Sequence, residues 1–130
     1  MPVNLTFNAI PAGSYVGTIS DIRFHHGEAT AIIPIYSIEH EGRTYSLSEY
    51  LPLDAPPEHP RYNDTAKGKG RVLTLLGPNP SIQDQDDLAH QLLGLKVRVA
   101  VGTRMQDDLP VPKVVAVARA EPLPNQAQVP

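Results

Sequence analysis

The chain has 130 residues, 41% of them hydrophobic, which suits one globular domain and is too apolar for a disordered chain. It contains no cysteine, which excludes disulfides, thiolate metal sites and thiol catalysis, and which fits a reducing cytoplasm. The net charge of −3, from 11 basic and 14 acidic residues, excludes a binder that relies on bulk positive charge, whereas one local basic groove stays compatible with it.

The sequence gives no sign of a membrane segment or a secretory signal. No apolar run approaches the length needed to cross a bilayer. The first six residues, Met-Pro-Val-Asn-Leu-Thr, lack both the basic start and the apolar stretch of a signal peptide. We therefore expect a cytoplasmic protein without a membrane partner.

The first part of the chain predicts three antiparallel strands joined by tight turns. Alternating side chains place these strands at residues 14–24, 29–40 and 43–53. Gly17 predicts a bulge or bend, and mixed faces predict a register change midway along the first strand. Pro34 cannot donate to a ladder, so we expect the second strand to be an edge strand or to be bulged there. The turns fall at residues 25–28 and at Glu41-Gly42.

A helical segment is expected after an irregular, proline-rich stretch at residues 54–62. Asn63 or Asp64 can cap a first helix that ends before Gly77. A second short helix is predicted over residues 82–93, with Ser81 as its cap.

The last part of the chain predicts two further strands. They lie at residues 95–103 and 111–119, with a polar loop at 104–109 and a flexible tail at 121–130. Three strands, a helical insertion and two strands are the layout of a five-stranded OB-type barrel with a helical insertion between strands three and four. We therefore expect a mainly β fold, with one OB-like domain over residues 1–120. A β-sandwich would show more strands, and a ferredoxin-like fold would place a helix after its first strand.

Several short motifs resemble those of small phage-encoded proteins. The opening Ile-Pro-Ala-Gly-Ser-Tyr-Val-Gly-Thr-Ile-Ser-Asp at residues 10–21 is similar to the start of this group. The similarity continues over residues 10–120, through Tyr50-Leu51, Leu75-Leu76-Gly77 and Leu92-Leu93-Gly94-Leu95. The resemblance implies an OB-like, single-stranded DNA-binding protein of phage replication or recombination, which acts in the host cytoplasm beside replication or recombination proteins. The chain departs from the group in its longer proline-rich segment and its few lysines.

Single-strand binders combine exposed aromatic rings, on which bases stack, with a basic groove for phosphates. The aromatic candidates on the second and third strands are Tyr36, Tyr45 and Tyr50. The basic candidates are Arg43, Lys67, Lys69, Lys96, Arg98 and Arg104. The alternative is that the tyrosines are partly buried barrel residues and that the charges only solvate strands. The stretch Lys-Gly-Lys-Gly-Arg at residues 67–71 lacks the spacing of a P-loop, and reads equally well as a basic loop on nucleic acid or as a solvated helix start.

The residues do not predict an enzyme, a metal site or a cofactor. His25 and His26 are adjacent on a strand, so they point to opposite faces and do not readily share one ion. Neither converging carboxylates nor a nucleophile elbow can be identified. The remaining alternative is a protein-interaction module, for example a host-directed inhibitor, an assembly factor or a homodimer. The net negative charge, the edge-like second strand and the proline-rich segment favour that alternative.

Overall fold

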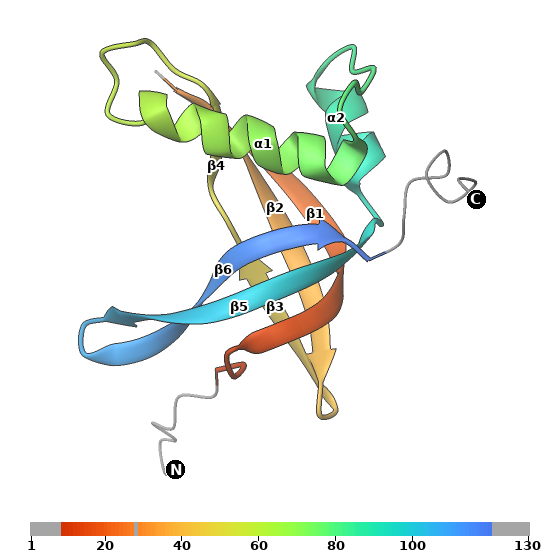
Figure 1. The fold of residues 1–130 in the computed structure, drawn as a ribbon, viewed down its shortest axis with the longest axis vertical. Helices are drawn as coiled ribbons and strands as arrows, with labels where there is room; N and C mark the ends of the chain where they lie inside the picture. The colour runs from red at the N-terminus through yellow and green to blue at the C-terminus, as the bar shows by residue number, and fades with distance from the viewer. Residues whose placement is uncertain (1–8, 28, 121–130) are drawn as a thin grey trace, which may run out of the picture.

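The computed structural model describes residues 9–27 and 29–120, which form a mainly β fold with two α-helices (Figure 1). The strands are β1 (Gly13–His26), β2 (Thr30–His40), β3 (Arg43–Ser48), β4 (Leu51–Asp54), β5 (Lys96–Gln106) and β6 (Leu109–Arg119). The helices are a 3-10 turn η1 (Tyr62–Asp64), α1 (Thr65–Leu76) and α2 (Gln85–Leu92).

All six strands belong to one antiparallel sheet in the order β3-β2-β1-β5-β6, with β4 also paired to β2. The mainly β prediction is confirmed. Within the described residues, strand pairing does not join β3 to β6, so the sheet is strongly curved in Figure 1 without closing into a hydrogen-bonded barrel.

Strand β1 pairs with both β5 and β2, and its register with β2 changes just after its pairing with β5 ends. Its residues 13–18 pair with β5, and its pairing with β2 shifts between Ile19 and Asp21, which confirms the predicted register change. The bulge does not lie at Gly17, however. A Cβ at Gly17 would stand 2.8 Å from the carbonyl oxygen of Ser37, so glycine is needed there because β2 approaches closely.

Strand β2 is a central strand, so the first of the two alternatives predicted from Pro34, an edge strand, is wrong. It pairs with β1 on one side and with β3 and β4 on the other. Pro34 is accommodated because pairing with β3 begins at Ile35 and pairing with β4 ends at Ile32. The missing N–H of Pro34 therefore falls at a break in the ladder, next to the interruption between β3 and β4.

The predicted third strand is divided in two at Glu49 and Tyr50. The turn at Glu41 and Gly42, which precedes β3, has the predicted tight form, with φ values of 51° and 78°.

Helix α1 packs directly against β4. A Cβ at Gly68 would stand 1.9 Å from the carbonyl oxygen of Pro52, so this close packing requires glycine within the helix.

Helix α1 begins and ends near the predicted residues, whereas the cap of α2 differs from the prediction. Asp64 precedes α1 without a side-chain capping bond, and Gly77 ends it at a φ of 97°. In α2 the capping residue is Asp84, not Ser81, because the Asp84 carboxylate accepts a hydrogen bond from the backbone N–H of Asp87 at 2.8 Å. The Asp87 carboxylate accepts the N–H of Gln83 in turn, which lowers the pKa of Asp87.

The predicted loop at residues 104–109 is instead the end of a long hairpin. Strands β5 and β6 continue to a two-residue turn at Asp107 and Asp108, whose φ values are 51° and 64°. Pairing with β1 stops at Val101, so the outer arms of the hairpin pair only with each other and project from the sheet (Figure 1). Within residues 9–27 and 29–120, no further strand pairs with the outer edge of either arm, and β6 can therefore carry Pro110 and Pro112.

The core lies between the curved sheet and the two helices. Its largest fully buried side chains are Tyr36, Ile19, Ile32, Ile38, Leu51, Leu75, Leu92, Val97, Val99 and Pro34. The alternation predicted for β5 is confirmed, with valines inward and Lys96 and Arg98 exposed. None of the helices among the described residues is long and apolar enough to cross a membrane. The predicted tail at 121–130 lies outside the described residues.

Candidate functional site

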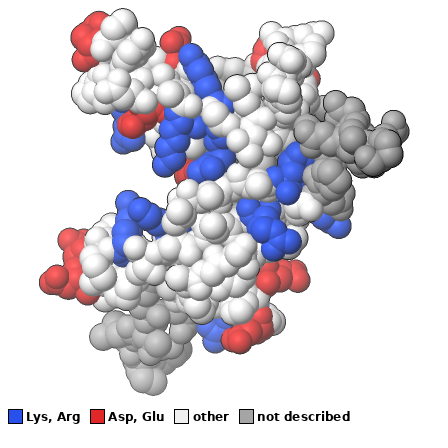
Figure 2. All heavy atoms as spheres, in the orientation of Figure 1, with Lys and Arg blue, Asp and Glu red and all other residues white. Residues whose placement is uncertain are grey.

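The main polar groove lies between the end of β3, the first turns of α1 and the β5–β6 hairpin. Its volume is about 420 Å³. Three cations line it, Lys67 from α1, Arg104 from β5 and Lys113 from β6, together with the ring of Tyr50 and with Glu49. In Figure 2, Lys and Arg side chains gather on both sides of a hollow, over α1 and over the β5–β6 hairpin. An anionic ligand would therefore meet positive charge from two separate elements.

Glu49 and Tyr50 form the break between β3 and β4, and the Glu49 side chain is buried whereas Tyr50 is partly exposed. The Glu49 carboxylate accepts two hydrogen bonds from the guanidinium of Arg71, from Nε at 3.0 Å and from Nη2 at 3.1 Å. The two side chains are only 8% and 11% exposed. This ion pair joins α1 to the β3–β4 break, and so fixes Lys67, one helical turn before Arg71, relative to Tyr50.

Tyr36 cannot serve as the stacking surface that the sequence predicted. Its side chain is fully buried, and its hydroxyl donates a hydrogen bond to Glu49 Oε2 at 2.5 Å. Burial, together with the adjacent carboxylate, raises the pKa of Tyr36 above that of an ordinary tyrosine. A ring without exposed surface offers no face to a base, so Tyr36 is a core residue that supports the groove from below.

Of the three predicted tyrosines, Tyr50 is the one whose ring is exposed in the groove. It is 37% exposed. The guanidinium carbon of Arg61 lies 4.8 Å from the centroid of its ring, and the ring of His25 lies 5.9 Å away at a tilt of 58°. Tyr45 is half-buried and packs against the core instead. The candidate stacking surface is therefore Tyr50.

The predicted basic residues do not all converge on this groove. Lys67 and Arg104 do, as described above. Lys69 instead lies beside an apolar depression between α1 and α2, of about 310 Å³. Arg43 begins β3 at the β2–β3 turn, at the opposite end of that strand from Tyr50.

The two predicted cations at the start of β5 lie elsewhere on the surface. Lys96 lines a separate depression that also contains Glu39, so positive charge there is offset. Arg98 is exposed beside Ala118, its partner in β6, and does not line the polar groove. Neither residue adds to the cationic lining around Tyr50.

Two residues of the site were missed from the sequence. Lys113 is the single cation of β6 before Arg119, and it reaches the groove because β6 turns back beside β5. Arg61 stands in the proline-rich segment and contacts Tyr50, eleven residues earlier in the chain. The only local feature that marks Arg61 in the sequence is the preceding Pro60, and a proline does not predict which aromatic ring a neighbouring cation will contact.

The histidines lie apart in aromatic contacts. His25 contacts Tyr50, His26 stacks near Phe24, and His40 lies edge-on to Tyr15 at 5.0 Å. Among residues 9–27 and 29–120, no three His, Asp or Glu side chains gather in a way that could hold a metal ion.

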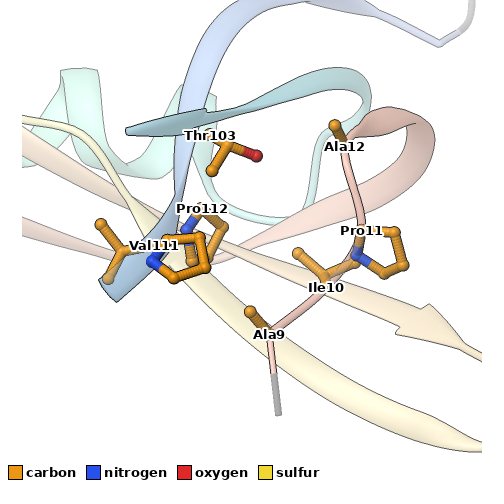
Figure 3. Close-up of a pocket in the computed structure, with 8 residues that line it drawn as sticks. Ala9, Ile10, Pro11, Ala12, Thr103, Val111 and Pro112 are labelled. Carbon is orange, nitrogen blue, oxygen red and sulfur yellow. The ribbon is translucent and has the colours of Figure 1, made fainter. Parts of the chain in front are cut away.

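A second, smaller depression lies between the residues before β1 and the β5–β6 hairpin (Figure 3). It measures about 220 Å³, and the residues around it, among them Ile10, Pro11, Thr103 and Val111, carry no ionisable side chain. It therefore offers shape and apolar contact but no charge for a phosphate.

No protein-family model matches the chain, and no curated protein matches it.

Proposed function

We propose that the protein binds single-stranded DNA, without catalysis, on an OB-type fold. An OB fold is a five-stranded, partly open barrel that binds oligonucleotides on its second and third strands and on the loops that join strands one to two and four to five. The counterparts here are β2, β3 with β4, the β1–β2 turn and the β5–β6 hairpin. A helix between β4 and β5 fits the same plan.

The observation that carries the proposal is the composition of the polar groove. Tyr50 provides a partly exposed ring, and Lys67, Arg104 and Lys113 provide three cations around it. These are the two components that single-strand binders combine, a surface for base stacking and a basic path for the backbone. The groove also lies at the β3 end and beside the hairpin, where an OB fold would receive its ligand.

A single strand fits this groove better than a duplex does. A stacking ring needs an exposed base face, which a base inside a duplex does not offer. The overall charge of −3 gives no general attraction for duplex phosphates, so binding must depend on the local cluster. In the phage setting implied by the sequence resemblance, this activity would protect or present single strands during replication or recombination.

Fluorescence anisotropy with a labelled 30-nucleotide single strand tests the proposal, beside a duplex of the same sequence. We expect preference for the single strand and a fall in affinity with salt. Three phosphate contacts would give a slope of log K against log salt of about −2, from ~0.7 for each contact. Single strands that fail to bind at low salt would overturn the proposal and favour the protein-interaction alternative, for which a pull-down from host lysate is the next step.

Matched variants locate the site. Tyr50→Ala should weaken binding by about 1–3 kcal/mol through lost stacking, whereas Tyr62→Ala, at a tyrosine that is 45% exposed outside the groove, should not. Lys67→Ala should lower the salt slope by ~0.7. Lys69→Ala, on another face of the same helix, should leave the slope unchanged. Equal effects of Lys67→Ala and Lys69→Ala would contradict the site.

A further inference from the structure

Arg61 covers one face of the candidate stacking ring in the free protein. Its guanidinium carbon lies 4.8 Å from the Tyr50 ring centroid, which is the geometry of a cation–π contact. The Arg61 side chain is nevertheless 53% exposed, and its ion pair with Asp64 is long, at 3.9 Å. The guanidinium is therefore held near the ring by weak contacts and remains accessible to solvent.

The proline-rich segment holds Arg61 over Tyr50 through a series of short turns. The N–H of His59 donates to the carbonyl of Pro56 at 2.9 Å, and the N–H of Tyr62 donates to the carbonyl of His59 at 3.0 Å. The N–H of Arg61 itself donates to Nδ1 of His59 at 3.0 Å. The backbone position of Arg61 is thus defined by local bonds, whereas its side chain can change partner without disturbing them.

The relative strengths of the contacts favour such a change when DNA is present. An exposed cation–π contact alters an equilibrium constant by about twofold to fivefold. A base stacked on an aromatic side chain contributes about fivefold to 150-fold. A base that competes for the Tyr50 ring therefore gains more than the displaced guanidinium loses. The guanidinium is also suited to its new surroundings, because its planar donors match phosphate oxygens.

We propose that Arg61 takes part in DNA binding by exchange: a base displaces its guanidinium from the Tyr50 ring, and the guanidinium then pairs with a phosphate beside that base. This inference rests on the proposed function and adds a fourth phosphate contact to it. Arg61 covers the ring while no strand is bound, and it becomes a ligand-binding residue once the strand arrives. Arg61 is then the residue of the proline-rich segment that takes part in DNA binding, although the sequence analysis connected this segment with protein contacts.

The experiment measures the salt slope of binding to a labelled 30-nucleotide oligothymidylate for the wild type, Arg61→Ala and Arg61→Lys. We expect Arg61→Ala to reduce the slope by ~0.7, the value for one phosphate contact. It should also weaken low-salt binding by about threefold to tenfold, because a charge-assisted contact contributes more than uncovering the ring returns. Arg61→Lys should keep the wild-type slope, because the charge remains.

Arg43→Ala is the matched control, because Arg43 is an exposed arginine roughly 20 Å from Tyr50 at ~3.3 Å for each residue of extended chain. It should leave the slope unchanged. Tighter binding by Arg61→Ala with an unchanged slope would overturn the inference, since Arg61 would then be only a cover, while the proposed function would stand. A wild-type protein that does not bind the single strand would overturn both.

Discussion

Replacing Glu49 by alanine should destabilise the fold far more than an ordinary surface substitution. The Glu49 carboxylate is the acceptor for the Arg71 guanidinium and for the Tyr36 hydroxyl, and all three side chains are buried or nearly so. Alanine would leave a buried cation and a buried hydroxyl without a partner. Breaking a buried ion pair from one side costs about 3–5 kcal/mol. The total stability of a domain of this size is about 5–15 kcal/mol, so the loss is a large share of it.

Urea and thermal unfolding measure this effect. At roughly 4 °C for each kcal/mol, the melting temperature of Glu49→Ala should fall by about 12–20 °C. The matched control is the double variant Glu49→Gln with Arg71→Met, in which glutamine keeps an acceptor for Tyr36 and methionine replaces the cation with an apolar chain. Removing both charges is often neutral or stabilising, so the double variant should recover to within about 1 kcal/mol of the wild type. A loss below about 1 kcal/mol for Glu49→Ala would refute the view that this cluster is a dry, fully paired network.

Four further substitutions test the packing of α1, the buried hydroxyl and the start of α2 by urea unfolding. Gly68→Ala should destabilise the fold by about 1–3 kcal/mol, because the new Cβ would collide with the Pro52 carbonyl. Gly70→Ala, with open space around the new Cβ, should instead stabilise the fold by about 0.5–1 kcal/mol. Equal losses of stability in the two variants would contradict this packing. Burial, with the adjacent carboxylate, raises the pKa of Tyr36 in the folded protein. The buried neutral hydroxyl therefore contributes its full stability below pH ~10, and this contribution falls above that pH by about 1.4 kcal/mol for each pH unit. Tyr36→Phe should remove that alkaline fall, and an identical alkaline limb would contradict the burial argument. Asp84→Ala should cost about 1 kcal/mol through loss of the α2 cap, and no loss would show that the cap is dispensable.

The strand pattern of the sequence predicted much of the fold where one face alone was apolar. In β5, valines alternate with Lys96 and Arg98, and the structure buries the valines. In β2 both faces are apolar, because Ile33 and Ile35 alternate with Ile32, Tyr36 and Ile38. Periodicity then identifies the two faces but not which one is inside, and Tyr36 was accordingly misplaced on the ligand side.

Contacts between residues far apart in the chain explain the remaining differences. The pair of Glu49 and Arg71 joins residues 22 positions apart, and no local pattern marks either of them as buried. The length of the β5–β6 hairpin was also missed, because the polar residues at 104–109, with Asp107 and Asp108 among them, were interpreted as a loop. Pro110 is compatible with β6 because, among the described residues, no other strand pairs with the outer edge of β6 and needs the missing N–H.

The buried cluster of Tyr36, Glu49 and Arg71 is linked through the chain to residues of the groove. This link predicts an effect on DNA binding in addition to the effect on stability. Tyr50 follows Glu49 directly, and Lys67 precedes Arg71 by one turn of α1, so the ion pair sets the spacing between the stacking ring and a groove cation. The double variant Glu49→Gln with Arg71→Met keeps the net charge, and we expect it to bind single strands several-fold more weakly with an unchanged salt slope, because cations are displaced but not lost. Anisotropy at a temperature where both proteins are fully folded measures this. Unaltered affinity would mean that the ion pair only stabilises the fold, and a lower slope would mean that Arg71 itself contacts phosphate.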